Sequence, residues 1–347
     1  MCGFFCIISS DQINLDASLE SLDLIKHRGP DSQKYFINNE KKIFFGFNRL
    51  SILDLSDKAD QPMLDKESGR IIVFNGEIYN HSKIRNLLKT KGYIFQTSSD
   101  TEVIIKAYDF WRDNLIENLE GMFSIVIYDP NENKIFFARD RAGEKPLYFY
   151  QSDKNFYLSS EIKPILHDSK NKHIALDALN NYFENGYTPK HKSMLRGVRK
   201  LKPGHKANLN LKSLELNIDR YWNLDKQISK PVKNSNKENH YYINKLENLL
   251  GNAVKEQLIA DVPIGMMLSG GVDSSLIVAT ASKYFEKLNT FTVIFPEMKK
   301  YDESKHAQLI AKHFKTNHME LNADDIGPEI FYKLVKYYDE PMVDSSM

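Results

Sequence analysis

The sequence predicts two successive folds. The first is an α+β sandwich of two stacked sheets with helices on both outer faces (αββα). The second is an α/β domain with a doubly wound parallel sheet. Three observations predict this order: many short β-rich runs in the first half, a polar charged stretch at 225–239, and alternating strands and helices after it. Strand-helix alternation is typical of a parallel sheet, whereas many strands with few helices favour stacked sheets.

The first half contains β-rich runs between turn residues and a few helical patterns. The expected strands are 4–9, 43–54, 71–75, 123–129, 134–139, 147–151 and 156–160. Apolar residues spaced by three and four predict helices at 16–27, 81–91, 100–111 and 176–184. Asn80 and either Ser99 or Asp100 are candidate caps. Asp129-Pro130-Asn131 has the chemistry of a hairpin turn.

After the polar stretch, expected helices and strands alternate along the second half. Helices are expected at 241–259, 273–287, 302–314 and 324–338, and strands at 263–268, 290–295 and 317–321. These patterns predict a first domain at 1–224, a linker at 225–239 and a second domain at 240–347.

Composition bounds the classes of function. The chain has 347 residues, enough for two cores, with 41% hydrophobic and 27% charged residues. A net charge of +1 gives no electrostatic reason to expect a nucleic acid or a membrane as partner. Cys2 and Cys6 would lie ~13 Å apart on one strand, too far for a disulfide. Free thiols without an export signal favour a cytoplasmic protein.

Cys2 follows the initiator methionine and is small enough for Met1 to be removed. Processing would leave a thiol and a free α-amine on one residue, a nucleophile and its base. Their reference pKa values are about 8.5 and about 7.7–8.0, so both titrate near neutral pH. The alternative is that a cysteine at this position is chance.

A candidate phosphate loop lies between an expected strand and an expected helix. It reads Ser269-Gly270-Gly271-Val272-Asp273-Ser274-Ser275. Glycines let backbone amides approach an anion, and the helix start adds unpaired N–H groups. Asp273 would repel phosphates unless it coordinates a bridging Mg²⁺. The alternative is a Gly-Gly turn capped by serines.

This loop resembles the SGGxDS motif of the ATP pyrophosphatases, which cleave ATP between its α and β phosphates. The resemblance implies an ATP site that includes Ser269, Gly270, Gly271, Asp273, Ser274 and Ser275. It also implies that Leu268 and Val293, near the ends of adjacent strands, help to hold the adenosine.

The N-terminal half resembles the class II glutamine amidotransferases, of the N-terminal-nucleophile hydrolase type. The resemblance rests on Met1-Cys2-Gly3, His27-Arg28-Gly29-Pro30-Asp31, Arg49-Leu50-Ser51-Ile52, Phe74-Asn75-Gly76-Glu77, Ser99-Asp100-Thr101-Glu102, Ala138-Arg139-Asp140-Arg141 and Lys145-Pro146-Leu147-Tyr148. Together with the loop at Ser269, this set resembles the glutamine-hydrolysing asparagine synthetase family over essentially the whole chain.

The resemblance implies a glutamine site. Arg49 would face the carboxylate of glutamine with two parallel hydrogen bonds. Glu77 and Asp100 would face its ammonium. The ordinary alternatives are a surface salt bridge for Arg49 and a helix cap for Asp100.

The resemblance also implies the machinery around the scissile amide. Asn75 and the backbone N–H of Gly76 would form an oxyanion hole, and a glycine would leave room for substrate. The carbonyl groups near Leu50 and Ile52 would hold the amide nitrogen. The alternative use of Asn75-Gly76 is a hairpin turn.

These features predict an ATP- and Mg²⁺-dependent amidotransferase. Glutamine hydrolysed at Cys2 would supply ammonia to an acyl-adenylate, with aspartate as the favoured acceptor and asparagine, glutamate, AMP and pyrophosphate as products. A sugar carboxylate as acceptor, glutaminase activity alone, and a non-catalytic binding protein are the alternatives. A homodimer is common in the family.

The family's synthetase domain continues past residue 347 with a second nucleotide loop. The chain is therefore expected to be a fragment whose partial parallel sheet exposes a strand edge and apolar faces.

Overall fold

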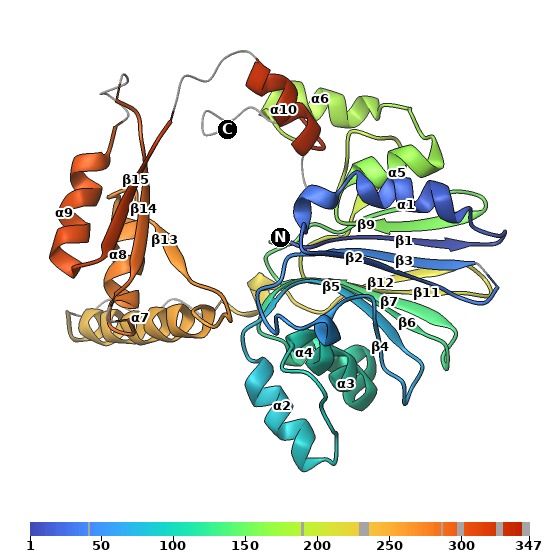
Figure 1. Ribbon diagram of the computed structural model, residues 1–347, viewed down its shortest axis with the longest axis horizontal. Coiled ribbons are helices and arrows are strands. Elements are labelled where there is room, and N and C mark those ends of the chain that lie inside the picture. Colours follow the sequence, from blue (N-terminus) through green and yellow to red (C-terminus); the bar gives the residue numbers. More distant parts are fainter. Residues whose placement is uncertain are drawn as a thin grey trace. The chain divides into compact units, whose positions relative to one another are not determined.

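A computed structural model describes residues 1–40, 42–188, 191–228, 236–285, 287–296, 302–323 and 329–341, with the side chains of 236–239 and 331 excepted. The chain divides into two compact units (Figure 1). Unit 1 comprises Met1–Ile228 with Leu334–Met347, and unit 2 comprises Ser229–Lys333. The first division lies four residues past the predicted domain end at 224. The segment from Leu334 onward was assigned to the second domain by the sequence but groups with unit 1.

Unit 1 contains two antiparallel six-stranded sheets stacked face to face. The first has the order β10 (Arg199–Lys200), β8 (Tyr148–Gln151), β9 (Asn155–Ser159), β1 (Gly3–Ser9), β3 (Ile43–Arg49), β2 (Ser32–Ile37). The second has the order β12 (Leu216–Arg220), β11 (His205–Asn210), β7 (Lys134–Arg139), β6 (Gly121–Asp129), β5 (Ile71–Ile78), β4 (Met63–Leu64).

Strict alternation of side chains explains the layers. Along β1, Phe4 and Cys6 face the core between the sheets, whereas Phe5 and Ile7 face outward. The outward face of this sheet is covered by α1 (Leu15–Asp23) and α5 (Ile162–Ser169). Both faces of the strand are therefore apolar, as expected of a strand buried on two sides.

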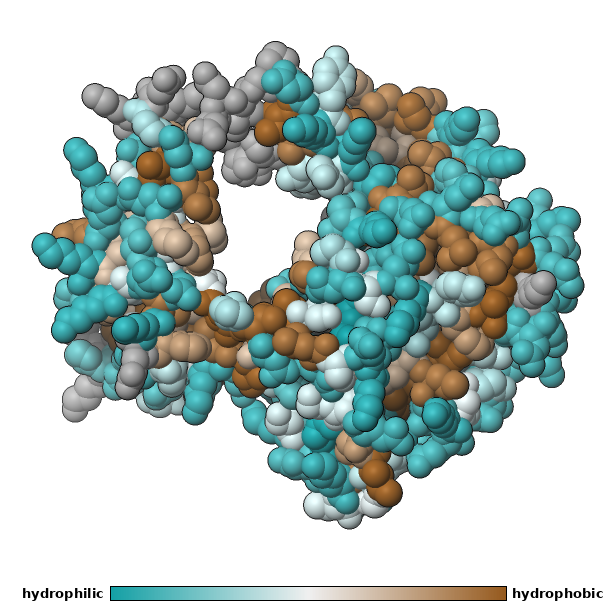
Figure 2. All heavy atoms as spheres, in the orientation of Figure 1, coloured by the Kyte–Doolittle hydropathy of each residue, from teal (hydrophilic) through white to brown (hydrophobic). Residues whose placement is uncertain are grey.

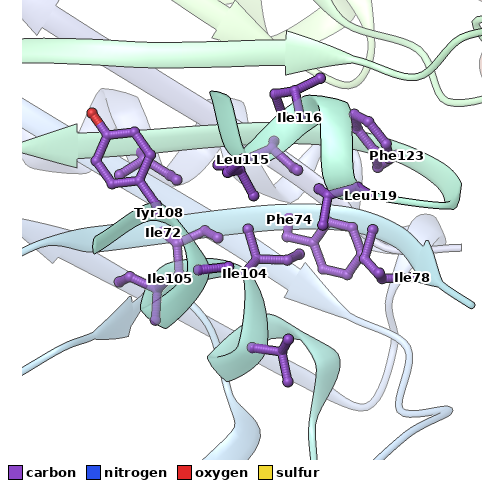
Figure 3. Close-up of a cluster of buried hydrophobic side chains, with 14 of the residues drawn as sticks. Ile72, Phe74, Ile78, Ile104, Ile105, Tyr108, Leu115, Ile116, Leu119 and Phe123 are labelled. Atoms are coloured by element: carbon purple, nitrogen blue, oxygen red, sulfur yellow. The ribbon is translucent and has the colours of Figure 1, made fainter. Parts of the chain in front are cut away.

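The outer face of the second sheet is covered by α2 (His81–Thr90), α3 (Asp100–Trp111) and α4 (Leu115–Asn118). Figure 3 shows Ile104 and Tyr108 of α3 packed with Ile72 and Phe74 of β5. Unit 1 also contains α6 (Leu176–Asn185). On the visible face of the molecule, hydrophilic side chains predominate and apolar patches interrupt them (Figure 2). The predicted αββα sandwich is confirmed.

Unit 2 contains a parallel sheet of three described strands, β13 (Gly265–Met267), β14 (Asn289–Ile294) and β15 (Asn317–Asn322). It also contains α7 (Asn236–Gln257), α8 (Val272–Ala281) and α9 (Ser304–Phe314). The final helix, α10 (Glu329–Tyr337), spans the division between the units. Helices connect consecutive parallel strands, so the α/β class is confirmed. The expected linker and the helix at 324–338 lie partly outside the described residues.

One face of this sheet carries exposed apolar side chains. Met267 and Met319 flank Phe291 in register, and Val293 pairs with Leu321. Met267 is 63% exposed and Leu321 49% exposed. Parallel sheets are normally covered on both faces. The apolar face expected from the sequence is therefore present among the described residues.

Some elements of unit 1 were not predicted. They are β2, β4, β10, β11, β12, α4 and α5, which are short or have apolar residues that are sparse or interrupted by charge. The hairpin at Asp129 joins β6 to β7 as predicted. Ser99 caps α3 by accepting a hydrogen bond from the N–H of Glu102.

Candidate functional site

Cys2 lies immediately before β1, partly buried beside the segment that follows β3. Its Sγ is 3.4 Å from both the backbone nitrogen and the backbone oxygen of Leu50. Burial raises the pKa of the Cys2 thiol, while the backbone N–H of Leu50 and the terminal ammonium oppose that rise. The thiol is therefore held mainly in its protonated form and needs a neighbouring base to become a nucleophile. Both cysteines are free, and Cys6 is buried in the core, as predicted.

One pocket in unit 1 brings together most residues that the sequence assigned to glutamine. Its lining includes Cys2, Arg49, Leu50, Ile52, Gly76, Glu77 and Asp100, together with Leu53, Ala59, Gln61, Phe74, Ser99 and Thr101. These residues come from the position before β1, the end of β3 and its following loop, the end of β5 and the start of α3. Tertiary packing therefore gathers segments that are far apart along the chain.

Asn75 and Gly76 lie inside β5, not in a hairpin turn. They pair with Ser124 and Phe123 of β6. A Cβ at position 76 would lie 2.0 Å from the backbone oxygen of Met122. The glycine is thus required by the neighbouring strand, a stronger reason than the substrate access expected from the sequence.

The side chain of Asn75 is almost fully buried, and its Nδ2 has no hydrogen-bond partner among the described residues. An unpaired buried donor is unfavourable unless a ligand satisfies it. The side-chain amide of Asn75 therefore has a free N–H that suits hydrogen bonding to an oxyanion. Asn75 is not among the residues that line the pocket.

Glu77 and Asp100 form a pair of acidic groups in the same pocket. Burial raises the pKa of both carboxyls, and the charge of Asp100 raises that of Glu77 further. Asp100 is not a helix cap: it follows the cap Ser99, and its Oδ2 accepts a hydrogen bond from the N–H of Ile78 at 3.0 Å. A cation in the pocket would favour the ionised form of both groups.

Glutamine binding is expected to strengthen as pH rises from about 6 to about 8. The pKa of Glu77 is raised to about 8, so below that pH it must lose a proton before it pairs with an ammonium. One such group changes affinity by up to about tenfold per pH unit. The measurement is titration calorimetry of glutamine with a Cys2→Ala variant in buffers of different ionisation enthalpy, which also counts released protons. Glu77→Gln should bind more weakly at alkaline pH and flatten the profile. A flat profile with no proton release in the parent would contradict this assignment.

Arg49 is buried, and its guanidinium already donates hydrogen bonds within the protein. Its Nη1 donates to Asp60 Oδ1 at 2.7 Å and to the carbonyl of Ser56 at 2.9 Å. Its Nη2 donates to the carbonyls of Leu53 and Asp54. The ion pair is therefore internal and not a surface salt bridge. Two parallel hydrogen bonds to a glutamine carboxylate would require the loop at 53–60 to release some of these contacts.

Gln61 lines the pocket but was not predicted from the sequence. It bridges β5 to α3: its amide nitrogen donates to Phe74 O and Thr101 Oγ1, each at 3.2 Å, and its carbonyl oxygen accepts from Phe74 N. A glutamine in a loop has no sequence signal that marks this role, because its partners lie on other elements.

The candidate phosphate loop joins β13 to α8 in unit 2. Gly271 is the N-cap residue of α8 and provides no side-chain cap. Ser275 Oγ is buried without a partner among the described residues, and Ser269 Oγ lies 3.0 Å from Ser274 Oγ. Gly270 has φ +81°, and a Cβ there would lie 2.6 Å from the Cβ of His306. Serines also bond the backbone of this loop: the N–H of Gly271 donates to Ser269 Oγ at 3.3 Å, and Ser274 Oγ donates to the carbonyl of Gly271 at 3.2 Å. The helix start without a side-chain cap and the unpaired Ser275 hydroxyl suit an anion.

Leu268 and Val293 differ in exposure. Leu268 is buried in the core with Val278 and Ala307, whereas Val293 is 40% exposed. Leu268 could therefore contribute to a nucleotide site through its backbone only. Asp273 is exposed in the first turn of α8. In the described part of the chain, no group of three or more His, Cys, Asp or Glu side chains is placed to hold a metal.

A family model described as a glutamine amidotransferase domain matches residues 1–222, and one described as asparagine synthase matches residues 245–347. Asparagine synthetase [glutamine-hydrolyzing] 1 of Bacillus subtilis is 32% identical over 99% of this chain and 54% of its own length. Putative asparagine synthetase [glutamine-hydrolyzing] 2 of Methanocaldococcus jannaschii is 34% identical over 100% of this chain and 70% of its own. The chain belongs to the glutamine-hydrolysing asparagine synthetase family.

Relatives of this chain differ in name. Amidase chry2 of Gibberella zeae is 32% identical over 99% of the chain and 52% of its own length. The chain thus spans about half the length of the B. subtilis and G. zeae relatives.

Among solved structures, glutamine phosphoribosylpyrophosphate amidotransferase of B. subtilis aligns with 96% of this chain and 70% of its own length, with a TM-score of 0.49 and 15% identity. Within the described residues, no helix has the length and apolar character needed to cross a membrane.

Proposed function

We propose that this asparagine synthetase family member hydrolyses glutamine at Cys2. The observation that supports this most is the pocket in unit 1, which places a thiol, two carboxyls and Gly76 together. After removal of Met1, the α-amine takes the thiol proton and Sγ attacks the side-chain amide of glutamine. Asn75 Nδ2 and the N–H of Gly76 stabilise the resulting oxyanion. The amine then returns the proton to the leaving ammonia, and water releases glutamate from the thioester.

The pocket offers each end of glutamine a different group. Glu77 and Asp100 pair with the ammonium, and Arg49 binds the carboxylate after exchanging loop contacts. Backbone groups at Leu50 and Ile52 hold the amide nitrogen. Two acidic groups of raised pKa favour a ligand that carries an ammonium group, as an amino acid does, over a carboxylic acid that lacks one.

The second part of the proposal is acyl adenylation in the complete protein. ATP would bind at the loop Ser269, Gly270, Gly271, Asp273, Ser274 and Ser275. Mg²⁺ held by Asp273 would neutralise phosphate charge. The acceptor is a carboxylate, and aspartate is the first candidate. With aspartate, the reaction of ATP and glutamine would give asparagine, glutamate, AMP and pyrophosphate. We also place the enzyme in the cytoplasm and expect a homodimer.

A sugar carboxylate is the second candidate acceptor. The relative named as an amidase supports testing an acceptor other than aspartate. Incubating the full-length protein with ATP, glutamine and either aspartate or a uronic-acid nucleotide distinguishes the two. AMP formed only with the sugar would reject aspartate. If glutamate is released but no acceptor leads to pyrophosphate formation, the protein has glutaminase activity only.

The test of the first part uses this chain directly. Intact mass should show loss of Met1, and a diazoketone analogue of glutamine should add one equivalent at Cys2. Retention of Met1, or no modification under conditions that alkylate denatured protein, would contradict glutamine hydrolysis and favour a non-catalytic binding protein.

A further inference from the structure

A buried ion-pair network in unit 1 connects the segment 337–339 to the residue before β1. Its members are Asp339, Lys163, Glu161 and Arg28. The side chains of Asp339, Glu161 and Arg28 are at most 10% exposed. Buried charges are strongly unfavourable when a partner is lost, so each member of this network constrains the next.

Asp339 contacts the start of α5 in two ways. Its Oδ1 accepts from Lys163 Nζ at 2.8 Å, and its Oδ2 accepts from the backbone N–H of Ile162 at 2.5 Å. Glu161, the N-cap residue of α5, makes no side-chain cap hydrogen bond. A carboxylate 177 residues further along the chain therefore supplies the acceptor for the first N–H of this helix.

Glu161 continues the network toward the chain terminus. Its Oε2 forms an ion pair with Lys163 Nζ at 2.5 Å, and its Oε1 lies 3.0 Å from Arg28 Nη1. Arg28 Nε donates to the carbonyl oxygen of Cys2 at 2.9 Å. A continuous series of polar contacts thus runs from Asp339 to the backbone of the residue that carries the thiol.

Tyr337 makes a second contact beside this network. Its ring packs edge-on against the ring of His27, with centroids 5.1 Å apart. His27 Nε2 lies 2.9 Å from Glu161 Oε1. The segment 337–339 therefore contacts two partners of Glu161, namely His27 and Lys163, and restricts where that carboxylate can lie.

The position of the Cys2 backbone matters for the proposed chemistry, because the nucleophile and its base both belong to this residue. A displacement of about 1 Å at a reacting group can lower a rate by about 100-fold. The hydrogen bond from Arg28 to the Cys2 carbonyl opposes such a displacement, and Glu161 orients the guanidinium that donates it.

We propose that Asp339 is a positioning residue for glutamine hydrolysis. It acts through Lys163 and Glu161. These two residues orient Arg28, and Arg28 holds the carbonyl of Cys2. The inference rests on the proposed function, since glutaminase activity is one of its two readouts.

The place of Asp339 in the sequence gives this inference its consequence. Asp339 lies within residues 245–347, which match the asparagine synthase model, and outside residues 1–222, which match the amidotransferase model. The glutaminase site is therefore completed by a residue from the part of the sequence that matches the synthase.

The first test follows Cys2 without any turnover. Cys2-Gly3 is the only cysteine-glycine pair in the chain. Labelling cysteine with ¹³C at the carbonyl and glycine with ¹⁵N therefore gives one carbonyl-correlated amide signal in the NMR spectrum of protein that has lost Met1. Arg28→Met defines the change in the carbonyl chemical shift when the hydrogen bond is removed. Asp339→Ala and Lys163→Met should each move the signal in the same direction, and the double variant should move it by less than the sum.

The second test is glutaminase kinetics, with the rate divided by the fraction of Cys2 that reacts with the diazoketone analogue of glutamine. In Asp339→Ala, kcat should fall by about 10- to 100-fold. KM should stay within about threefold, because the four network residues are not among those that line the glutamine pocket. Asp339→Asn retains an acceptor for the N–H of Ile162 and should lose less activity than Asp339→Ala.

Glu340→Gln is the matched control. Glu340 is the next residue of the same segment, but it pairs with Lys200 and accepts from the N–H of Met194. Glutamine retains an acceptor for that N–H. The variant should leave both the Cys2 signal and kcat unchanged.

An unmoved Cys2 signal in Asp339→Ala and in Lys163→Met, both verified as folded by thermal unfolding, overturns the inference. A moved signal with an unchanged kcat in a chain that hydrolyses glutamine overturns it as well. A moved signal in a chain that never hydrolyses glutamine supports the network from Asp339 to Cys2 but rejects the proposed function. If Asp339→Ala does not fold, Asp339→Asn and Lys163→Met decide between these outcomes.

Discussion

Replacing Cys2 with alanine is expected to abolish glutamine hydrolysis, by at least about 10³-fold in kcat. Cys6 cannot substitute, because it is fully buried in the core between the sheets. Glutamate release measured with a coupled dehydrogenase gives the rate. The fold should persist, since the hydrogen bonds of Sγ are two long contacts, both with Leu50.

The matched control is Cys6→Ala. It removes a buried sulfur from the core and should lower the free energy of unfolding by about 1–2 kcal/mol while leaving kcat within about twofold. Cys2→Ala should show the reverse pattern, with little change in stability. Hydrolysis within about tenfold of the parent rate in Cys2→Ala would reject the thiol as nucleophile.

Gly76→Ala is expected to destabilise unit 1 severely. The new Cβ would lie 2.0 Å from Met122 O and 2.8 Å from the Cα of Phe123, both backbone atoms of β6. The strands cannot separate without breaking their hydrogen bonds, so the loss should be about 3 kcal/mol or more. Any folded fraction should have lost glutaminase activity, because Gly76 lines the pocket.

Gly92→Ala provides the comparison. Gly92 has φ +91° but nothing within 4 Å of an added Cβ, so only backbone strain of about 1 kcal/mol is expected. Trp111 and Trp222, the two tryptophans of the chain, lie in unit 1, so their fluorescence during urea unfolding follows this unit. Equal losses for the two variants would contradict a steric role for Gly76.

The fold class was accessible from the sequence because local patterns carry it. The apolar run of β1, the turn at Asp129 and the cap at Ser99 are encoded by neighbouring residues. Elements with mixed polarity, such as β11 and β12, were missed because their stability depends on pairing with strands elsewhere. The grouping of the final segment with unit 1 likewise depends on long-range partners: Asp339 Oδ1 accepts from Lys163 Nζ, and Glu340 Oε1 accepts from the N–H of Met194.

The sequence by itself determined which residue types are available for chemistry: a terminal thiol at Cys2, an Asn-Gly pair and a glycine-serine loop before a helix. Only the tertiary structure decided how they are used. Asn75-Gly76 lies inside a strand, and the Arg49 guanidinium donates hydrogen bonds to loop carbonyls. Leu268 packs in the core, and Lys145 Nζ lies beside the sulfur of Met1. These outcomes depend on burial and on contacts between distant segments, and neither is encoded in the spacing of residues along the chain.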